Sequence, residues 1–243
     1  ENLRIVLHKD IIPEEFLPTF NCNPIEMNLH RIPGLDEEYL YFNDDMFPVG
    51  DCRPTDFFRD GKAVIGYYRH FFASNMYKKI CRNSDRLARE ALGLKPSVFF
   101  TRPQHICSPM LKSVCDEVYE KVNAQIRETS ATRTRTENNL NQYLFLDYMN
   151  YKGLVINEKI SNKHFSVSVA SPESLRNFLQ NPTRNLVCIN DVHGVAYAVD
   201  VRALLLEVTE AKRQASVGIF ALVKMVDAVD ICRVVHHLHV FTA

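Results

Sequence analysis

Asn43, Asp44 and Asp45 place an amide and two adjacent carboxylates directly after the apolar, aromatic run from Tyr39 to Phe42. That run predicts a short buried strand. Carboxylates beside a buried strand are costly to desolvate unless they are paired, protonated or bound to a cation. Mg²⁺ or Mn²⁺, which prefer hard oxygen ligands, would remove that cost. The alternative is a polar turn at the strand end, where Asn and Asp are common.

A second apolar run, residues 185–189, also ends in an amide and a carboxylate, Asn190 and Asp191. The carboxyl ends of neighbouring parallel strands gather at one edge of a sheet, where ligands bind. We therefore expect Asp45, Asn190 and Asp191 to lie together as ligands of a metal ion that accompanies a diphosphate. The alternative is again a polar turn.

Three further residues have side chains suited to phosphate chemistry. Glu26 follows a helix start predicted at Asn23 and Pro24, and could either act in a site or complement the helix dipole. His105 could accept a proton from a hydroxyl near neutral pH, or be an ordinary packed loop residue. Arg135 could bind phosphate through its planar fork of donors, or be one charge of a solvated face.

Several of these residues lie in segments that resemble the Stealth family. Residues 17–47 resemble its second block, through Asn-x-x-x-Ile-Glu ending at Glu26, His-Arg-Ile-Pro-Gly-Leu from His30, and Phe-Asn-Asp-Asp ending at Asp45. Residues 102–150 resemble the third block, which includes His105 and Arg135. Residues 185–191 resemble the fourth. The first block, a strand ending in Thr-Trp-Val-Asp, has no counterpart in this sequence, which contains no tryptophan.

The resemblance implies an activity. The family contains bacterial capsular polysaccharide phosphotransferases and the Golgi N-acetylglucosamine-1-phosphotransferase, and the short stretch between Asp45 and Arg102 favours the bacterial branch. We expect transfer of a sugar-1-phosphate from a nucleotide sugar, such as a UDP-hexose, to a hydroxyl of an acceptor glycan. The alternative is a truncated, non-catalytic relative that binds glycan or nucleotide only.

The resemblance also implies roles for individual residues. The expected catalytic residues are Glu26, Asp44, Asp45, His105 and Arg135. The expected substrate-binding residues are Asn21, Asn23, His30, Arg31, Asn43 and Arg133. The expected ligands of Mg²⁺ or Mn²⁺ are Asp45, Asn190 and Asp191.

The order of predicted elements indicates an α/β fold with a mostly parallel sheet flanked by helices and the catalytic site at the carboxyl ends of the strands. Predicted strands include residues 3–7, 39–42, 62–70, 98–101, 165–170 and 185–189. Predicted helices include residues 74–92, one opening at Pro109, 140–152, and one starting at Ser171-Pro172. Residues 1–193 form the predicted catalytic domain. Residues 194–243 form a C-terminal helical extension of unknown role, with helices at 201–213 and 217–229.

Composition limits the partners and the compartment. The 243 residues contain 29 Lys plus Arg and 29 Asp plus Glu, so no global charge favours nucleic acid. The seven cysteines include no Cys-x-x-Cys pair, which fits reduced thiols in the cytoplasm. His236, His237 and His239 have a spacing that fits no helical ligand pair. No apolar run reaches the roughly 18 to 20 residues of a membrane helix. We expect a cytoplasmic protein, peripherally associated with the inner face of the bacterial plasma membrane or with the capsule machinery.

Overall fold

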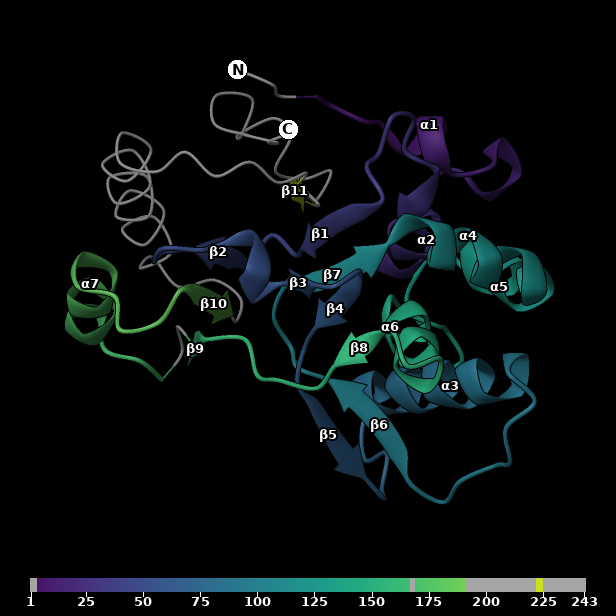
Figure 1. Cartoon of the computed structure of the whole chain (residues 1–243). Coiled ribbons are helices and arrows are strands. Elements are labelled where there is room, and N and C mark those ends of the chain that lie inside the picture. Colours follow the sequence, from purple (N-terminus) through teal and green to yellow (C-terminus); the bar gives the residue numbers. More distant parts are fainter. Residues whose placement is uncertain (1–3, 167–168, 191–221, 225–243) are drawn as a thin grey trace.

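The computed structural model of this chain describes residues 4–166, 169–190 and 222–224 (Figure 1). The helices of this part are α1 His8–Ile11, α2 Cys22–Asn28, α3 Met76–Ala91, α4 Lys112–Lys121, α5 Asn123–Ser130, α6 Tyr143–Tyr151 and α7 Pro172–Gln180. The strands are β1 Glu38–Phe42, β2 Met46–Pro48, β3 Phe58–Arg59, β4 Lys62–Val64, β5 Tyr67–His70, β6 Phe100–Pro103, β7 Ser108–Leu111, β8 Val155–Ile156, β9 Asn162–Ser166, β10 Leu186–Asn190 and β11 Leu222–Lys224.

The described strands form three small mixed sheets and one antiparallel pair rather than one mostly parallel sheet. Their orders are β11-β1-β7, β2-β10-β9, β3-β4-β8 and β5-β6. In each three-stranded sheet the central strand pairs with one neighbour in parallel and with the other antiparallel. The α/β class is therefore confirmed, whereas the described sheets do not show the expected mostly parallel arrangement.

Helix α6 lies at the centre of the described core. Its residues from Tyr143 to Met149 are all buried, including Asp147. A helix that is apolar on nearly every side must be surrounded by other elements, and α3, α4, β6 and β7 pack around it. The buried start of α6 is consequently fixed in position, and residues Gln142 and Tyr143 lie there.

Some predicted elements differ from those observed. Pro109 opens no helix: it lies in β7, opposite Leu40 of β1, and the following helix begins at Lys112. The backbone N–H of Ser113 in that helix donates to the carboxylate of Glu37 at 3.1 Å. The helix start is thus satisfied by the residue just before β1 rather than by a local cap. The described residues 4–7 form no strand, and the predicted strand 62–70 is divided into β4 and β5.

Two strand pairings connect the first part of the described chain with the last. Strand β10 pairs antiparallel with β2, which begins directly after Asp45. Strand β11 pairs in parallel with β1, with Leu222 opposite Leu40. Residues 222–224 are thus a strand and not part of the predicted helix 217–229. The predicted helix 201–213 and the rest of the predicted extension lie outside the described residues.

Candidate active site

Glu26 lies in α2 with its carboxylate buried. The helix starts two residues earlier than predicted, at Cys22 rather than Pro24, because Asn21 rather than Asn23 is the cap. Asn21 Oδ1 accepts from the backbone N–H of Asn23 at 3.1 Å. Glu26 is 5% exposed. The Nδ2 of Asn23 donates to Glu26 Oε2 at 3.5 Å, while Asn23 Oδ1 is buried with no partner in the described part of the chain.

The environment of Glu26 sets its protonation near neutrality. Tyr41 Oη donates to Oε1 at 3.3 Å and the backbone N–H of Gln142 donates to Oε2 at 3.3 Å. With its amide turned to satisfy both groups, Gln142 also donates to Oε2 at 2.7 Å. Burial raises the pKa of Glu26 to about 7, although these donors and the charge of Arg135 act in the opposite direction. A carboxyl group with this pKa can exchange a proton at physiological pH.

Arg135 lies at the exposed edge of the same group. Its Nη2 donates to Sγ of Cys22 in the first turn of α2. Burial raises the pKa of the Cys22 thiol to about 12, so the sulfur is a thiol at neutral pH. Within the described part of the chain Arg135 makes no other hydrogen bond, so most of its donors are left for a ligand. Arg133 is exposed, and its backbone carbonyl accepts from Phe20 at 2.9 Å.

Asn21 holds the arginine segment beside α2. Its Nδ2 donates to Asn139 Oδ1 and to Thr132 Oγ1, both at 3.0 Å. Asn139 Oδ1 also accepts from the backbone of Thr136 at 2.9 Å. Asn21 is buried, so these contacts give it a positioning role. Direct contact between Asn21 and substrate stays a prediction.

The Asn43-Asp44-Asp45 segment is both a turn and part of a polar cluster. The carbonyl of Asn43 accepts from the backbone of Met46 at 3.2 Å, which closes a β-turn. The Asp44 side chain is exposed, whereas Asp45 is half-buried. Asp45 Oδ1 is buried without a hydrogen-bond partner among the described residues. The two aspartates thus point to different surroundings, as their alternation along the chain predicts.

Asp45 faces two side chains from distant parts of the sequence. Its Oδ2 accepts from Cys188 Sγ at 3.4 Å, and its backbone carbonyl accepts from Ile189 at 2.8 Å. One ligand atom each from Asp45, His105 and Cys188 lie within 4.8 Å of one another. We call these three residues the Asp-His-Cys cluster.

His105 is oriented by a chain of hydroxyl groups. Its Nδ1 lies 3.1 Å from Tyr143 Oη, which in turn lies 2.9 Å from Tyr77 Oη. Burial lowers the pKa of His105, with Asp45 acting against this and Arg102 with it. The imidazole is therefore neutral at physiological pH and can accept a proton.

The start of α6 joins the two groups. Gln142 binds Glu26, and the next residue, Tyr143, binds His105. Adjacent residues of a buried helix start cannot move independently. The group of Glu26 and Arg135 is therefore fixed in position relative to the group of Asp45 and His105. Four residues of these two groups were not predicted from the sequence: Tyr41, Gln142, Tyr143 and Cys188. Cys188 stands within an apolar strand and resembled core, whereas the polar run 138–142 before an apolar helix was a usable signal.

His30 and Arg31 belong to a different environment. His30 is 2% exposed, and its ring packs against Tyr119 at 5.0 Å and Phe145 at 5.9 Å between centroids. Arg31 is exposed and donates to Asn28 at 3.3 Å and to Tyr119 Oη at 3.4 Å. These contacts favour a packing role for His30, because substrate cannot reach a ring enclosed in this way. The predicted substrate contacts stay untested.

The side chains around Asp45 match only in part the oxygen ligands that Mg²⁺ or Mn²⁺ prefers. Asp45 offers one carboxylate oxygen without a partner, as a site for Mg²⁺ or Mn²⁺ requires. Its two neighbours in the cluster offer nitrogen and sulfur. Asn190 is exposed at the end of β10, and Asp191 lies outside the described residues. Asp45 and Cys188 lie close together because β2 pairs antiparallel with β10. We had expected the closeness to arise from adjacent ends of parallel strands.

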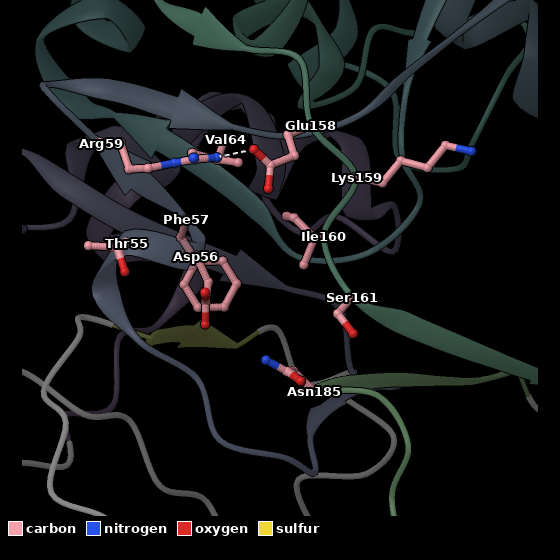
Figure 2. Close-up of a pocket in the computed structure, with 10 residues that line it drawn as sticks. All are labelled: Thr55, Asp56, Phe57, Arg59, Val64, Glu158, Lys159, Ile160, Ser161 and Asn185. Carbon is pink, nitrogen blue, oxygen red and sulfur yellow. Dashed lines mark hydrogen bonds and ion pairs between the residues drawn. The ribbon is translucent and has the colours of Figure 1, made fainter.

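A pocket of about 300 Å³ lies elsewhere, between β3, β4 and the segment 158–161. Figure 2 shows Arg59 paired with Glu158 along one edge of the pocket and Asn185 at the opposite edge. None of the predicted site residues lines this pocket. Asn185 precedes Cys188 by three residues of an extended segment, which corresponds to roughly 10 Å. The pocket is therefore near one end of β10 and the Asp-His-Cys cluster near the other.

The fold and these clusters describe an α/β protein with acid, base and guanidinium groups suited to phosphate chemistry. A profile described as Stealth protein CR2, conserved region 2, matches residues 1–65. The chain is 34% identical over 227 residues to the receptor polysaccharide phosphotransferase WefC of Streptococcus gordonii, covering 80% of this chain and 68% of the relative. It is 33% identical to the capsular polysaccharide phosphotransferase WcwK of Streptococcus pneumoniae, with the same shares covered. The chain belongs to the Stealth family.

Burial shifts the pKa values of Glu26 and His30 in opposite directions, so we expect the stability of the protein to depend on pH through both residues. The pKa of Glu26 is raised from 4.5 to about 7, so its contribution to the free energy of unfolding declines as the pH rises between these values. The pKa of His30 is lowered by burial from 6.5 to about 4, so its contribution increases with pH across that interval. Where the intervals overlap, the two contributions offset each other.

Replacing Glu26 or His30 removes its contribution to the change of the free energy of unfolding with pH, so the contribution of the other residue becomes measurable. Glu26→Gln is expected to make the free energy of unfolding rise with pH, relative to the unmodified chain, by up to about 1.4 kcal/mol per pH unit. His30→Asn is expected to change the slope in the opposite direction. Urea unfolding of each variant across the overlapping pH interval measures this. Parallel curves for the unmodified chain and Glu26→Gln would contradict the raised pKa.

Proposed function

We propose that this protein transfers a sugar-1-phosphate from a nucleotide sugar to a hydroxyl of a glycan during synthesis of a bacterial capsular or related cell-surface polysaccharide. Its relatives are named as polysaccharide phosphotransferases. The observation that supports the reaction most directly is the pairing of two proton-exchanging groups, Glu26 and His105, with consecutive residues at the buried start of α6.

The reaction requires one bond to form and one to break. The acceptor oxygen attacks the phosphorus that carries the sugar, and the bond from that phosphorus to the nucleoside monophosphate breaks. The proton of the hydroxyl passes to a base, and His105 is the candidate, since it is neutral and has Nδ1 occupied by Tyr143. Glu26, with a pKa of about 7, is the second candidate. Arg135 is placed at the exposed edge to bind phosphate oxygens.

The proposed cation is Mg²⁺ or Mn²⁺, with Asp45 as its ligand. Mg²⁺ is usually held in proteins by one or two carboxylates together with the phosphates of the substrate, so a single partner-free oxygen of Asp45 suits an ion that arrives with the nucleotide sugar. When bound, such an ion neutralises charge on the diphosphate. Asn190 and Asp191 remain proposed additional ligands.

Release of nucleoside monophosphate tests the proposal. The chain is incubated with a panel of UDP- and CMP-sugars, capsule-type oligosaccharide acceptors and Mg²⁺ or Mn²⁺, and UMP or CMP is quantified. We expect release that depends on the acceptor and yields a phosphodiester-linked product detectable by mass spectrometry. Binding of a nucleotide sugar without any release would overturn the transferase proposal and favour the non-catalytic binding module.

A surface at the tip of β5 and β6 supports the proposed location at the membrane. Phe72 and Val98 are 74% and 73% exposed, and the Phe71 ring contacts those of Phe72 and Phe99 at centroid distances of 4.5 and 5.4 Å. The guanidinium of Arg69 lies 4.8 Å from the centre of the Phe99 ring. We call these five residues the aromatic tip. Apolar side chains with an adjacent cation suit the headgroup region of an anionic bilayer.

No helix in the described ranges is long and apolar enough to cross a bilayer. The proposed contact of the aromatic tip is with the bilayer surface. Cosedimentation with vesicles of phosphatidylglycerol is expected to exceed that with phosphatidylcholine. The double variant Phe72→Ser/Val98→Ser is expected to lose at least tenfold in vesicle affinity. Val169→Ser, which alters a side chain 85% exposed in another part of the chain, is the matched control. Equal affinity of the double variant and the control would contradict a membrane role for the aromatic tip.

A further inference from the structure

We infer that the Asp-His-Cys cluster binds a zinc-class transition metal ion when no nucleotide sugar is present. The cluster brings together one carboxylate, one imidazole and one thiol from the turn before β2, the loop before β7 and strand β10. Their ligand atoms lie within 4.8 Å of one another. The ion preferred by this set differs from the Mg²⁺ or Mn²⁺ proposed to accompany the nucleotide.

The type of ligand decides which ion binds. Mg²⁺ takes oxygen ligands in octahedral geometry, so a sulfur and a nitrogen in its first shell are unfavourable. Zn²⁺ and Co²⁺ accept sulfur, nitrogen and oxygen together in a tetrahedral arrangement. A site with three protein ligands leaves the fourth position for water or for an oxygen of a ligand, which is the arrangement of exchangeable zinc sites.

The distances require only a small adjustment. In a tetrahedral zinc site, metal–ligand bonds of about 2.0 to 2.3 Å place the ligand atoms about 3.4 Å apart. Cys188 Sγ and Asp45 Oδ2 are already 3.4 Å apart. The antiparallel pairing of β2 with β10 fixes their backbones, and the bond from Ile189 to the carbonyl of Asp45 adds a further constraint. The ligand atoms lie within 4.8 Å of one another, so the imidazole of His105 has to approach by at most about 1.4 Å, which a side-chain rotation supplies.

The surroundings of the cluster provide a second, independent argument. A histidine that binds a metal usually has its other ring nitrogen held by a hydrogen bond. His105 Nδ1 is held by Tyr143, itself bound to Tyr77, so Nε2 is the nitrogen left for the ion. Asp45 Oδ1 is buried and has no partner within the described residues, and a cation bound to this carboxylate through Oδ2 offsets the cost of its burial.

Titration with Co²⁺ alone tests the site without reference to catalysis. The chain is first freed of metal with a chelator. Co²⁺ is expected to bind with one equivalent per chain and to give a thiolate-to-cobalt charge-transfer band, together with the intense visible bands of tetrahedral cobalt. Zn²⁺ is expected to abolish both, whereas a large excess of Mg²⁺ leaves them unchanged. Because no turnover is measured, failure here is distinct from failure of the proposed transferase activity.

Variants identify the ligands. Cys188→Ser is expected to lose the charge-transfer band and at least tenfold in Co²⁺ affinity. Cys52→Ser, which alters a half-buried cysteine outside the cluster, should keep both properties. His105→Gln keeps the thiol and is expected to lower affinity at least tenfold, so the inference stays testable if Cys188→Ser fails to fold by circular dichroism.

Two results would overturn the site. The first is the absence of a charge-transfer band from the unmodified chain. The second is an undiminished band in Cys188→Ser and undiminished affinity in His105→Gln, which would place the metal on other residues, such as the histidines at 236, 237 and 239 outside the described part of the chain.

Discussion

Glu26→Gln is expected to lower kcat for sugar-phosphate transfer by about 10²- to 10⁴-fold, the contribution typical of a positioned acid or base. The replacement has nearly the same shape but cannot take up or release a proton at neutral pH. It also turns an amide nitrogen toward the donors of Gln142 and Tyr41, which bind the carboxylate in the unmodified protein. The rate of monophosphate release under saturating substrate measures the effect.

Glu120→Gln is the matched control, since it makes the same chemical change at an exposed position of α4. It is expected to keep kcat within about threefold. Circular dichroism and urea unfolding establish that Glu26→Gln is folded under assay conditions. A folded Glu26→Gln protein with a kcat close to that of Glu120→Gln would remove Glu26 from the chemistry and leave it a structural role beside α6.

Asp45→Asn is expected to have the second large effect, a loss of at least about 100-fold in kcat/KM. The substitution removes the negative charge that faces His105 and offers an oxygen to a cation. It also weakens the proposed binding of Mg²⁺, so the apparent affinity for the ion should fall with the rate. Activity measured over a range of Mg²⁺ and Mn²⁺ concentrations separates the two effects.

Asp44 provides the comparison for Asp45. Asp44→Asn makes the same change one residue earlier, on a side chain that is exposed. The loss in kcat/KM is expected to be at least tenfold smaller than for Asp45→Asn. Equal losses, or a larger loss at Asp44, would contradict the orientation of the turn and assign the principal role to the exposed carboxylate.

The sequence predicted those helices and strands that depend mainly on neighbouring residues in the chain. The aromatic run gave the strand β1, and Ser171-Pro172 gave the start of α7, where the Ser171 hydroxyl accepts from Ser174. Pro109 misled because proline also suits strands at positions without a required N–H. Its place in β7 depends on the partner β1, and such pairing between distant segments is invisible to a local pattern.

The sequence indicated several residues of the candidate site but not how they are arranged in space. The acids that follow the aromatic run drew attention to Asp45, whereas Glu26, His105 and Arg135 were favoured through the family resemblance. Cys188 was not identified, because a cysteine inside an apolar strand is usually core. The link through Gln142 and Tyr143 also escaped prediction, since it depends on which residues of α6 face which neighbours. That orientation is decided by packing.

The contact of Asp45 with Cys188 joins residues 143 positions apart in the sequence. During synthesis, the turn that carries Asp45 leaves the ribosome long before β10 exists to pair with β2. At about 5 to 20 residues per second, that delay lasts many seconds. The Asp-His-Cys cluster is therefore completed only after β10 emerges, and a nascent or prematurely terminated chain without β10 lacks it. A chain that stops before β10 therefore lacks one of the three side chains on which metal binding is proposed.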